Sequence, residues 1–180
     1  MTKFPGYFYM SEAPTCGRMQ YRVDADMRWA GDPGAQIGLA FGDDRGLGHV
    51  YLYTINTVNQ EALLIRFNPD GAGQVLLHVG GMSMIHSGTA SNHLTVIYRP
   101  GEINLYINGF FTYIIPNLTS NALSWAGLVG APYSNQATAD ARYDNFRVID
   151  FIPGTPFETA SGFAPLDSLD RPLWPLVRNP

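Results

Sequence analysis

Two carboxylates stand two residues apart in QYRVDADMRW, residues 20–29. Because side chains at i and i+2 of a strand point to the same face, Asp24 and Asp26 share a face with Arg22 and Arg28, and apolar side chains occupy the other face. A pair of carboxylates on one face could act as an acid and a base. The flanking arginines instead favour a solvated ladder of cross-strand ion pairs. We therefore expect a half-buried strand with one wet, charged face.

The other residue types that carry chemistry do not form a catalytic motif. No Gly-x-Ser-x-Gly nucleophile motif is present, and the glycine-rich GDDRGLG at 42–48 lacks the Lys-Ser/Thr of a phosphate-binding loop. His86 and His93 flank one predicted loop and could bind a metal ion together, although ordinary structural positions explain both. The sequence therefore predicts no enzymatic activity.

Aromatic and amide side chains on the predicted strands could bind a sugar. Sugars present aliphatic faces that stack on aromatic rings, and hydroxyl groups that hydrogen-bond to Asn, Asp and Arg side chains. Five residues would supply such groups if their strands share a concave face: Tyr51, Tyr53, Tyr98, Asn104 and Tyr106. Aromatic residues on strands also pack in cores or against cross-strand partners, and the sequence leaves this alternative open.

The composition limits the class of protein and its partners. A chain of 180 residues with 13% aromatic residues, 19 glycines, 13 prolines and 14% charged residues is typical of a single turn-rich β domain. The formal net charge is −4 and the lysines and arginines form no run, so we expect no nucleic-acid partner. No window approaches eighteen apolar residues, so no membrane-spanning helix is predicted.

Alternation with a period of two predicts about ten strands and no helix long enough for a parallel crossover. Tight turns are predicted at Asn108-Gly109 and at Asn68-Pro69-Asp70-Gly71. An antiparallel all-β fold follows. The strands are expected over residues 6–12, 20–29, 36–42, 49–56, 61–68, 74–80, 92–99, 102–108, 110–115, 125–131 and 141–151.

The strand at 36–42 has one face of small residues. Large side chains alternate there with Gly38, Ala40 and Gly42. Something could therefore approach this second face closely, either a neighbouring sheet or a ligand.

Four stretches carry a resemblance to a known family: IGLAFGDD (37–44), NHLTVIYRPGEINLYING (92–109), WAGLVGAPYSN (125–135) and ARYDNFRVID (141–150). In order and spacing they resemble the concanavalin A-like lectin/glucanase superfamily, in its laminin G-like, glycosidase-associated branch of bacterial proteins. That branch carries an aromatic-Asp-Asn-Phe unit on its last strand, which matches Tyr143 to Phe146. The resemblance implies a two-sheet β-sandwich, a jelly roll, over about residues 6–152, with a concave sheet often used for ligands.

The resemblance also implies what chemistry to look for. Retaining glycosidases of the superfamily use Glu-x-Asp-x-x-Glu or a related pattern on one strand, and none of the four glutamates here begins it. Many relatives hold Ca²⁺ near one end of the sandwich, and Asp43 and Asp44 offer suitable oxygen ligands. Arg45 follows these two residues directly, and its positive charge would oppose the binding of a divalent cation. We expect no cofactor, with Ca²⁺ as a possibility at these two residues.

After a sandwich domain at 1–152, residues 153–180 form a Pro-rich, extended tail with six prolines and no strand alternation. Such a segment is ordered only when its apolar side chains are buried, either on its own sandwich or on another chain. The residues expected to dock are Phe157, Phe163, Leu173, Trp174 and Leu176.

Two functions remain open. The preferred hypothesis is a non-catalytic interaction module, an accessory or structural subunit that docks on a partner protein in a larger assembly. The alternative is a lectin-like carbohydrate-binding module with a glycan partner. The habits of the family favour an extracytoplasmic location, the periplasm or the cell surface, although residues 1–15 show no signal peptide.

Overall fold

The computed structural model describes residues 9–12, 20–30, 35–43, 49–99, 101–118, 124–131 and 140–150. These residues contain strands and turns and no helix, so no helix among them could cross a membrane. The strands are β1 (Tyr9–Glu12), β2 (Tyr21–Trp29), β3 (Gln36–Asp43), β4 (Val50–Asn56), β5 (Glu61–Phe67), β6 (Gly73–Val79), β7 (Asn92–Arg99), β8 (Gly101–Ile107), β9 (Phe110–Leu118), β10 (Ser124–Ala131) and β11 (Ala141–Asp150).

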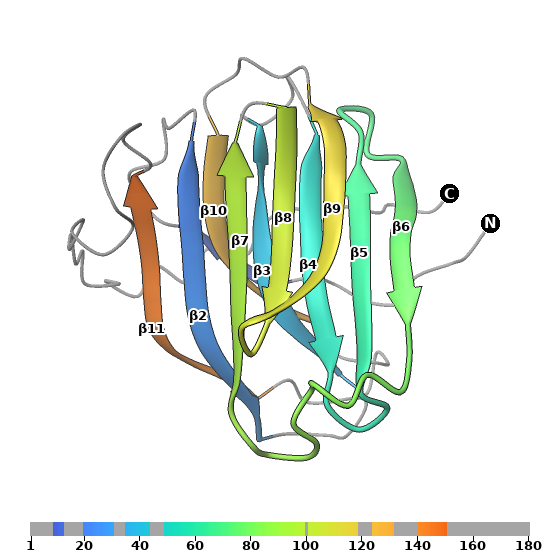
Figure 1. Cartoon of the computed structure of the whole chain (residues 1–180), viewed down its shortest axis with the longest axis vertical. Coiled ribbons are helices and arrows are strands. Elements are labelled where there is room, and N and C mark those ends of the chain that lie inside the picture. The colour runs from blue at the N-terminus through green and yellow to red at the C-terminus, as the bar shows by residue number, and fades with distance from the viewer. Residues whose placement is uncertain are drawn as a thin grey trace.

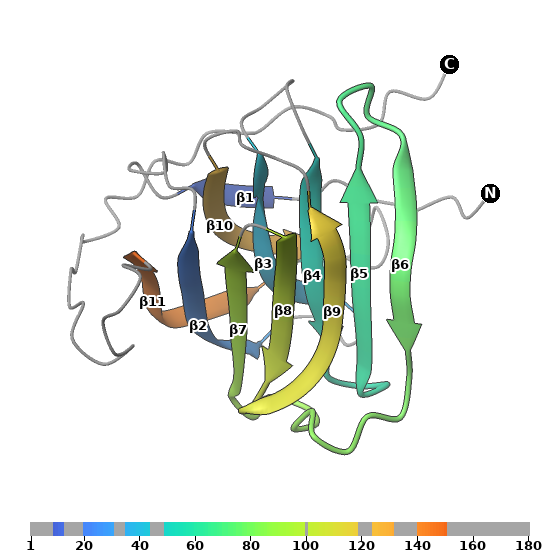
Figure 2. The ribbon, with the colours of Figure 1, turned by 45° about the horizontal axis from the view of Figure 1, so that its top comes forward.

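The strands form two antiparallel sheets that pack face to face (Figures 1 and 2). The six-stranded sheet has the order β1-β10-β3-β4-β5-β6, and the five-stranded sheet has the order β11-β2-β7-β8-β9. Figure 2 shows the five-stranded sheet in front of β10, β3 and β4. The predicted all-β, antiparallel sandwich is confirmed.

The turn residues act as the sequence predicts. Asn108 and Gly109 join β8 to β9 with φ angles of 50° and 82°, which Asn and Gly adopt at the least cost. Between β5 and β6, the amide of Gly71 donates a hydrogen bond to the carbonyl of Asn68, 2.9 Å. As a result β8 and β9 are neighbours in one sheet, and β5 and β6 are neighbours in the other.

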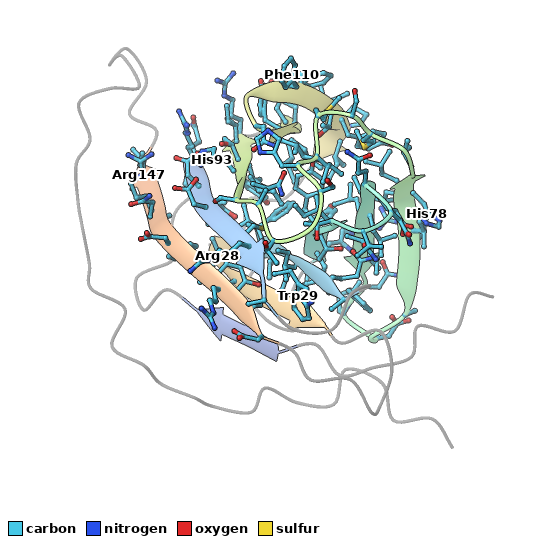
Figure 3. The ribbon with its side chains drawn as sticks, turned by 90° about the horizontal axis from the view of Figure 1, so that it is seen from below. Arg28, Trp29, His78, His93, Phe110 and Arg147 are labelled. Atoms are coloured by element: carbon cyan, nitrogen blue, oxygen red, sulfur yellow. The ribbon has the colours of Figure 1, made fainter. Side chains whose placement is uncertain are left out.

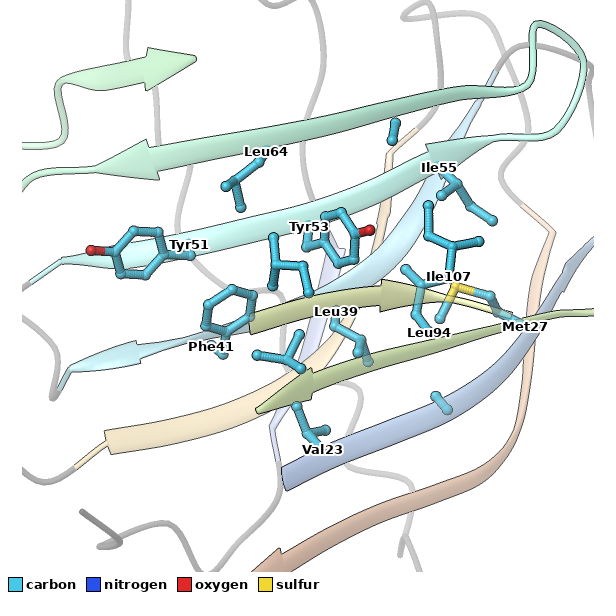
Figure 4. Packing of buried hydrophobic residues seen from close by; sticks show 14 of the residues in the cluster. Val23, Met27, Leu39, Phe41, Tyr51, Tyr53, Ile55, Leu64, Leu94 and Ile107 are labelled. Carbon is cyan, nitrogen blue, oxygen red and sulfur yellow. The ribbon is translucent and has the colours of Figure 1, made fainter. Parts of the chain in front are cut away.

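The main core lies between the two sheets and is built from the apolar phase of each strand. On β2, every second residue from Tyr21 to Trp29 is buried. Figure 4 shows Leu39, Phe41, Tyr51 and Tyr53 of the six-stranded sheet with Leu94 and Ile107 of the other sheet in this cluster. Burial of these side chains is the main stabilisation of the sandwich.

Two tyrosines form hydrogen bonds between the sheets. The hydroxyl of Tyr53 on β4 lies 2.6 Å from Oγ1 of Thr112 on β9. Since Thr112 donates to the carbonyl of Leu105, 2.9 Å, its Oγ1 accepts from Tyr53. On β11, the hydroxyl of Tyr143 donates to the carbonyl of Val129 on β10. Each buried hydroxyl therefore has a partner, as burial requires.

The backbone at and just before the neighbouring strand β4 explains why one face of β3 carries only small residues. A Cβ atom at Gly38 would lie 2.0 Å from the backbone oxygen of Tyr53, and one at Gly42 would lie 2.2 Å from that of His49. The close approach expected from the sequence is thus made by the backbone beside β3, within the same sheet, at both glycines.

The Pro-rich tail lies outside the described residues, so the docking of Phe157, Phe163, Leu173, Trp174 and Leu176 stays a prediction. The described part ends at Asp150, the last residue of β11. The division of the chain at residue 152 likewise stays a prediction.

Candidate functional site

The outer face of the five-stranded sheet carries most of the polar side chains that the two sheets direct away from the core. We call it the polar face. Its main residues are Arg22, Asp24, Asp26 and Arg28 on β2, His93 and Thr95 on β7, Asn104 and Tyr106 on β8, Phe111 on β9, and Asn145 and Arg147 on β11.

Strand register places one row of these side chains across the whole sheet. Arg147 pairs with Asp24, Asp24 with Thr95, Thr95 with Tyr106, and Tyr106 with Phe111. The row therefore begins in a group of charged side chains and ends in two aromatic rings.

Asp24 is the buried centre of the charged group. Its side chain is 0% exposed, and its Oδ1 accepts hydrogen bonds from Oγ1 of Thr95 at 2.6 Å and from Nε of Arg22 at 2.8 Å. Its Oδ2 lies 3.7 Å from Nη2 of Arg147. Burial alone would raise the pKa of Asp24, but hydrogen bonds from His93, Thr95 and Arg22 lower it below 3.8. The predicted solvated ladder is therefore wrong for this residue.

His93 joins the two carboxylates of β2. Its Nδ1 lies 2.7 Å from Oδ1 of Asp26, and its Nε2 lies 3.5 Å from Oδ1 of Asp24. The hydrogen bond with Asp24 is the largest effect on the pKa of His93 and raises it above 6.5, although partial burial opposes the shift. The two carboxylates therefore favour the protonated form of His93.

An irregularity in β11 directs an amide at the same group. The register between β11 and β2 shifts between Asp144 and Arg147, which marks a β-bulge. Within it Asn145 has a φ of 53°, and its Nδ2 donates a hydrogen bond to Oδ2 of Asp26, 2.6 Å. Burial raises the pKa of Asp26, but the bonds from Asn145 and His93 outweigh it and lower the pKa. The aromatic-Asp-Asn-Phe unit of the sequence contains this bulge.

The aromatic end of the row is open to solvent. Phe111 is 54% exposed, and its ring meets that of Tyr106 edge to face with centroids 5.7 Å apart. The adjacent Phe110 is 60% exposed. In Figure 3 Phe110 stands at the rim of the molecule, with His93 and Arg147 next to each other on the same side. Fixed hydrogen-bonding groups thus share a face with exposed rings.

The predicted sugar-binding residues do not share one face. Tyr51, Tyr53 and Tyr98 are 1%, 0% and 3% exposed and lie in the core. There Tyr51 stacks on Phe41 and Tyr98 stacks on Tyr21. The expectation of one shared face is corrected, because these three tyrosines occupy the apolar phase of their strands. Asn104 and Tyr106 do lie together on the polar face.

Five residues of the polar face were not identified from the sequence as parts of one site: His93, Thr95, Phe111, Asn145 and Arg147. One signal was available, since His93, Thr95, Asn104 and Tyr106 follow the same alternation that places Asp24 on a polar face. Their partners across the sheet depend on strand order, which alternation does not give.

The predicted metal sites remain predictions. Asp43 ends β3 opposite Ser124, but its side chain and the whole of Asp44 lie outside the described part. His86 Nδ1 lies 2.8 Å from the carbonyl of Ser91, so His86 and His93 have separate partners. Among the described residues no group of three or more His, Cys, Asp or Glu side chains could hold a metal ion.

Comparison with known proteins finds similarity of structure. No family model matches the chain, and no curated protein matches it in sequence. The carbohydrate-binding module CBM66 from Bacillus subtilis superposes with a TM-score of 0.58 at 15% identity, over 81% of this chain and 83% of that one. A β-glucanase from Bacillus licheniformis gives 0.59 at 11% identity, over 79% and 71% of the two chains.

A third similar structure is part of a larger enzyme. The GH43 protein BlXynB (K247S mutant) from Bacillus licheniformis gives a TM-score of 0.55 at 11% identity, over 74% of this chain and 28% of that one. At such identities the similarity establishes the fold.

Proposed function

We propose that this chain, which has the concanavalin A-like lectin/glucanase fold, is a non-catalytic carbohydrate-binding module and that its polar face holds the glycan. The observation that carries the proposal is the row from Arg147 through Asp24 and Thr95 to Tyr106 and Phe111. It joins charged and hydrogen-bonding groups to an exposed aromatic surface.

The two ends of the row suit the two surfaces of a sugar. The exposed ring of Phe111, supported by Tyr106, offers a flat apolar surface for the aliphatic face of a pyranose or furanose ring. Arg147, Asp26 and Asn145 offer donors and acceptors for hydroxyl groups. Since His93 and Asn145 already bond to Asp26, and His93 also pairs with Asp24, little ordering is needed on binding, which favours affinity.

The fold comparison supports the same function. CBM66 is described as a carbohydrate-binding module, and the superposition covers most of both chains. The β-glucanase shares the fold, so the fold alone does not separate binding from hydrolysis.

The chemistry of the polar face supports binding without hydrolysis. Glycoside hydrolysis needs a carboxylic acid that stays protonated, and therefore a raised pKa, beside a second carboxylate. Asp24 and Asp26 both have lowered pKa values because hydrogen bonds to His93 and other donors stabilise their charged forms. This carboxylate pair therefore lacks the proton donor of a glycosidase.

The accessory-subunit hypothesis is not carried forward as the preferred function. It rested on residues 153–180, which lie outside the described part, and the descriptions of the three similar structures above name no protein partner. An extracytoplasmic location agrees with a glycan ligand and belongs to the proposal. Calcium binding at Asp43 and Asp44 stays a prediction, and the experiment below therefore compares glycan binding with calcium and with a chelator.

The experiment is a broad glycan array probed with the full chain, once with calcium and once with a chelator. We expect at least one class of glycan to bind above background, and a signal that survives the chelator would show that binding does not need calcium. Absence of binding under both conditions would overturn the proposal.

A further inference from the structure

The six-stranded sheet buries a second apolar cluster on the side that faces away from the core. We call it the back face. Its members are Ala40 on β3, Leu52 on β4, Leu63, Ile65 and Phe67 on β5, and Val129 on β10. Each is 7% exposed or less, and Ala40, Leu52 and Val129 are 0% exposed.

This burial needs a cover. An antiparallel sheet packed on one side normally alternates apolar residues inward with polar residues outward. Here the five-stranded sheet contacts the inner side, and no described strand lies on the back face. On β4 the outward residues Leu52, Thr54 and Asn56 are all buried as well. On the polar face, in contrast, Arg28 and Phe111 are exposed.

We propose that residues 153–180 lie across the back face and bury it. These residues carry seven Phe, Leu and Trp side chains spaced among six prolines: Phe157, Phe163, Leu166, Leu169, Leu173, Trp174 and Leu176. A proline-rich segment forms few ladder hydrogen bonds, so it is ordered by burying side chains. An apolar sheet face offers that kind of contact.

The length and the position of residues 153–180 favour them as the cover of the back face. Fully extended, 28 residues span roughly 90 Å, whereas the four strands from β10 to β5 occupy roughly 15–20 Å of sheet width. The connections at 13–19, 31–34, 44–48, 119–123 and 132–139 have eight residues or fewer and are fixed at both ends, and only eight residues, 1–8, precede β1. The segment also follows β11, which is joined to the back-face strand β10 by the Tyr143 hydrogen bond to the carbonyl of Val129.

This inference does not depend on glycan binding, but it bears on which face of the sandwich a glycan could reach. If the back face is covered by the chain itself, the polar face is the sheet surface left open to a ligand.

Paramagnetic labelling of the full chain tests the inference. Cys16 is the single cysteine, so Cys16→Ser gives a background in which one new cysteine can carry a spin label. A label at Val50→Cys would sit on β4 beside the back face, since Val50 packs against this cluster and is only partly buried. A control label at Phe110→Cys would sit on β9, in the other sheet, at a well-exposed position.

We expect the Val50 label to attenuate amide signals of residues 155–180 by more than half, and the Phe110 label to leave them unchanged. Attenuation of residues 1–8 in place of the tail would assign the cover to the N-terminal segment and overturn the inference. Tail signals unaffected by the Val50 label would also overturn it.

A second measurement needs no label. Leu173→Asp combined with Leu176→Asp should raise the fluorescence of a dye that binds apolar surfaces and lower the unfolding temperature, whereas Asp170→Ser should change neither. If the double variant behaves like the wild type, the tail does not cover the back face. Should it fail to fold, the labelling result decides.

Discussion

Nδ1 of His93 lies 2.7 Å from Oδ1 of Asp26, which makes this histidine the link between β7 and the carboxylates of β2. The same ring approaches Asp24, whose side chain is fully buried. In its protonated form His93 directs one ring N–H toward each of the two carboxylates, so the stability of the centre of the polar face depends on pH.

The first prediction concerns that pH dependence. The pKa of His93 is raised above 6.5, so its contribution is complete below pH 6.5 and is lost as the pH rises through the raised value. The pKa values of Asp24 and Asp26 are lowered below 3.8, so their contribution is present above pH 3.8 and is lost as the pH falls through the lowered values. The free energy of unfolding supplied by this group is greatest between pH 3.8 and pH 6.5.

Chemical denaturation of His93→Gln and of the wild type, from below pH 3.8 to above pH 6.5, checks this pH dependence of the free energy of unfolding. The variant should be less stable than the wild type at pH 5.5. Its free energy of unfolding should also lack the decline that His93 causes in the wild type above pH 6.5. His78→Gln is the matched control, because His78 is 61% exposed and lies on β6, away from the polar face. A His93→Gln protein that keeps the wild-type decline would contradict the account.

The second prediction separates core tyrosines from the polar face. Tyr53→Phe removes the hydroxyl that bonds to Thr112 and should lower the free energy of unfolding by about 1 kcal/mol. Because Tyr53 is buried between the sheets, affinity for a glycan should not change. A loss of affinity without a loss of stability would restore Tyr53 as a binding residue.

The third prediction tests the small-residue face of β3. Gly38→Ala places a Cβ atom against the backbone of Tyr53, where no side chain can move aside, and should destabilise the protein by about 2–3 kcal/mol. Gly80→Ala is the control, because a Cβ there meets nothing within 4 Å. Equal unfolding midpoints for the two variants would show that β4 does not require glycine at 38.

The fourth prediction concerns the bulge in β11. Asn145→Ala and Asn145→Gly both remove the hydrogen bond to Asp26, but only alanine is also strained at a φ of 53°. Asn145→Ala should therefore be less stable than Asn145→Gly by about 1 kcal/mol. Thermal unfolding of the two variants measures this difference, and the reverse order would argue against a left-handed residue in the bulge.

Much of the fold was predictable because local signals and tertiary packing agree. The alternation in β2, β7 and β8 places the same side chains inward that the core requires, and the Asn108-Gly109 turn fixes the register of β8 and β9. Where the described residues allow a comparison, predicted and observed strand bounds differ by at most one residue, except that β9 continues three residues beyond its predicted end at 115.

The site was less predictable because its contacts join distant parts of the chain. Asp24 was expected to be solvated, but Thr95 from β7 and Arg147 from β11 enclose it, and only the strand order β11-β2-β7 brings them there. Asn145 reaches Asp26 through a bulge that alternation does not reveal. The three core tyrosines show the opposite error, because an aromatic residue on a strand has the same sequence signature in a core and in a binding face.

Binding of the best glycan from the array to Phe111→Ala, measured by calorimetry beside Val58→Ala, tests the central claim most directly. Both side chains are about half exposed, but Val58 lies in the turn between β4 and β5, outside the polar face. The account predicts that Phe111→Ala weakens binding about tenfold, the equivalent of roughly 1.4 kcal/mol of lost stacking, while Val58→Ala binds like the wild type and both variants keep the wild-type unfolding temperature. Unchanged affinity of Phe111→Ala would contradict the assignment of the glycan site to the polar face.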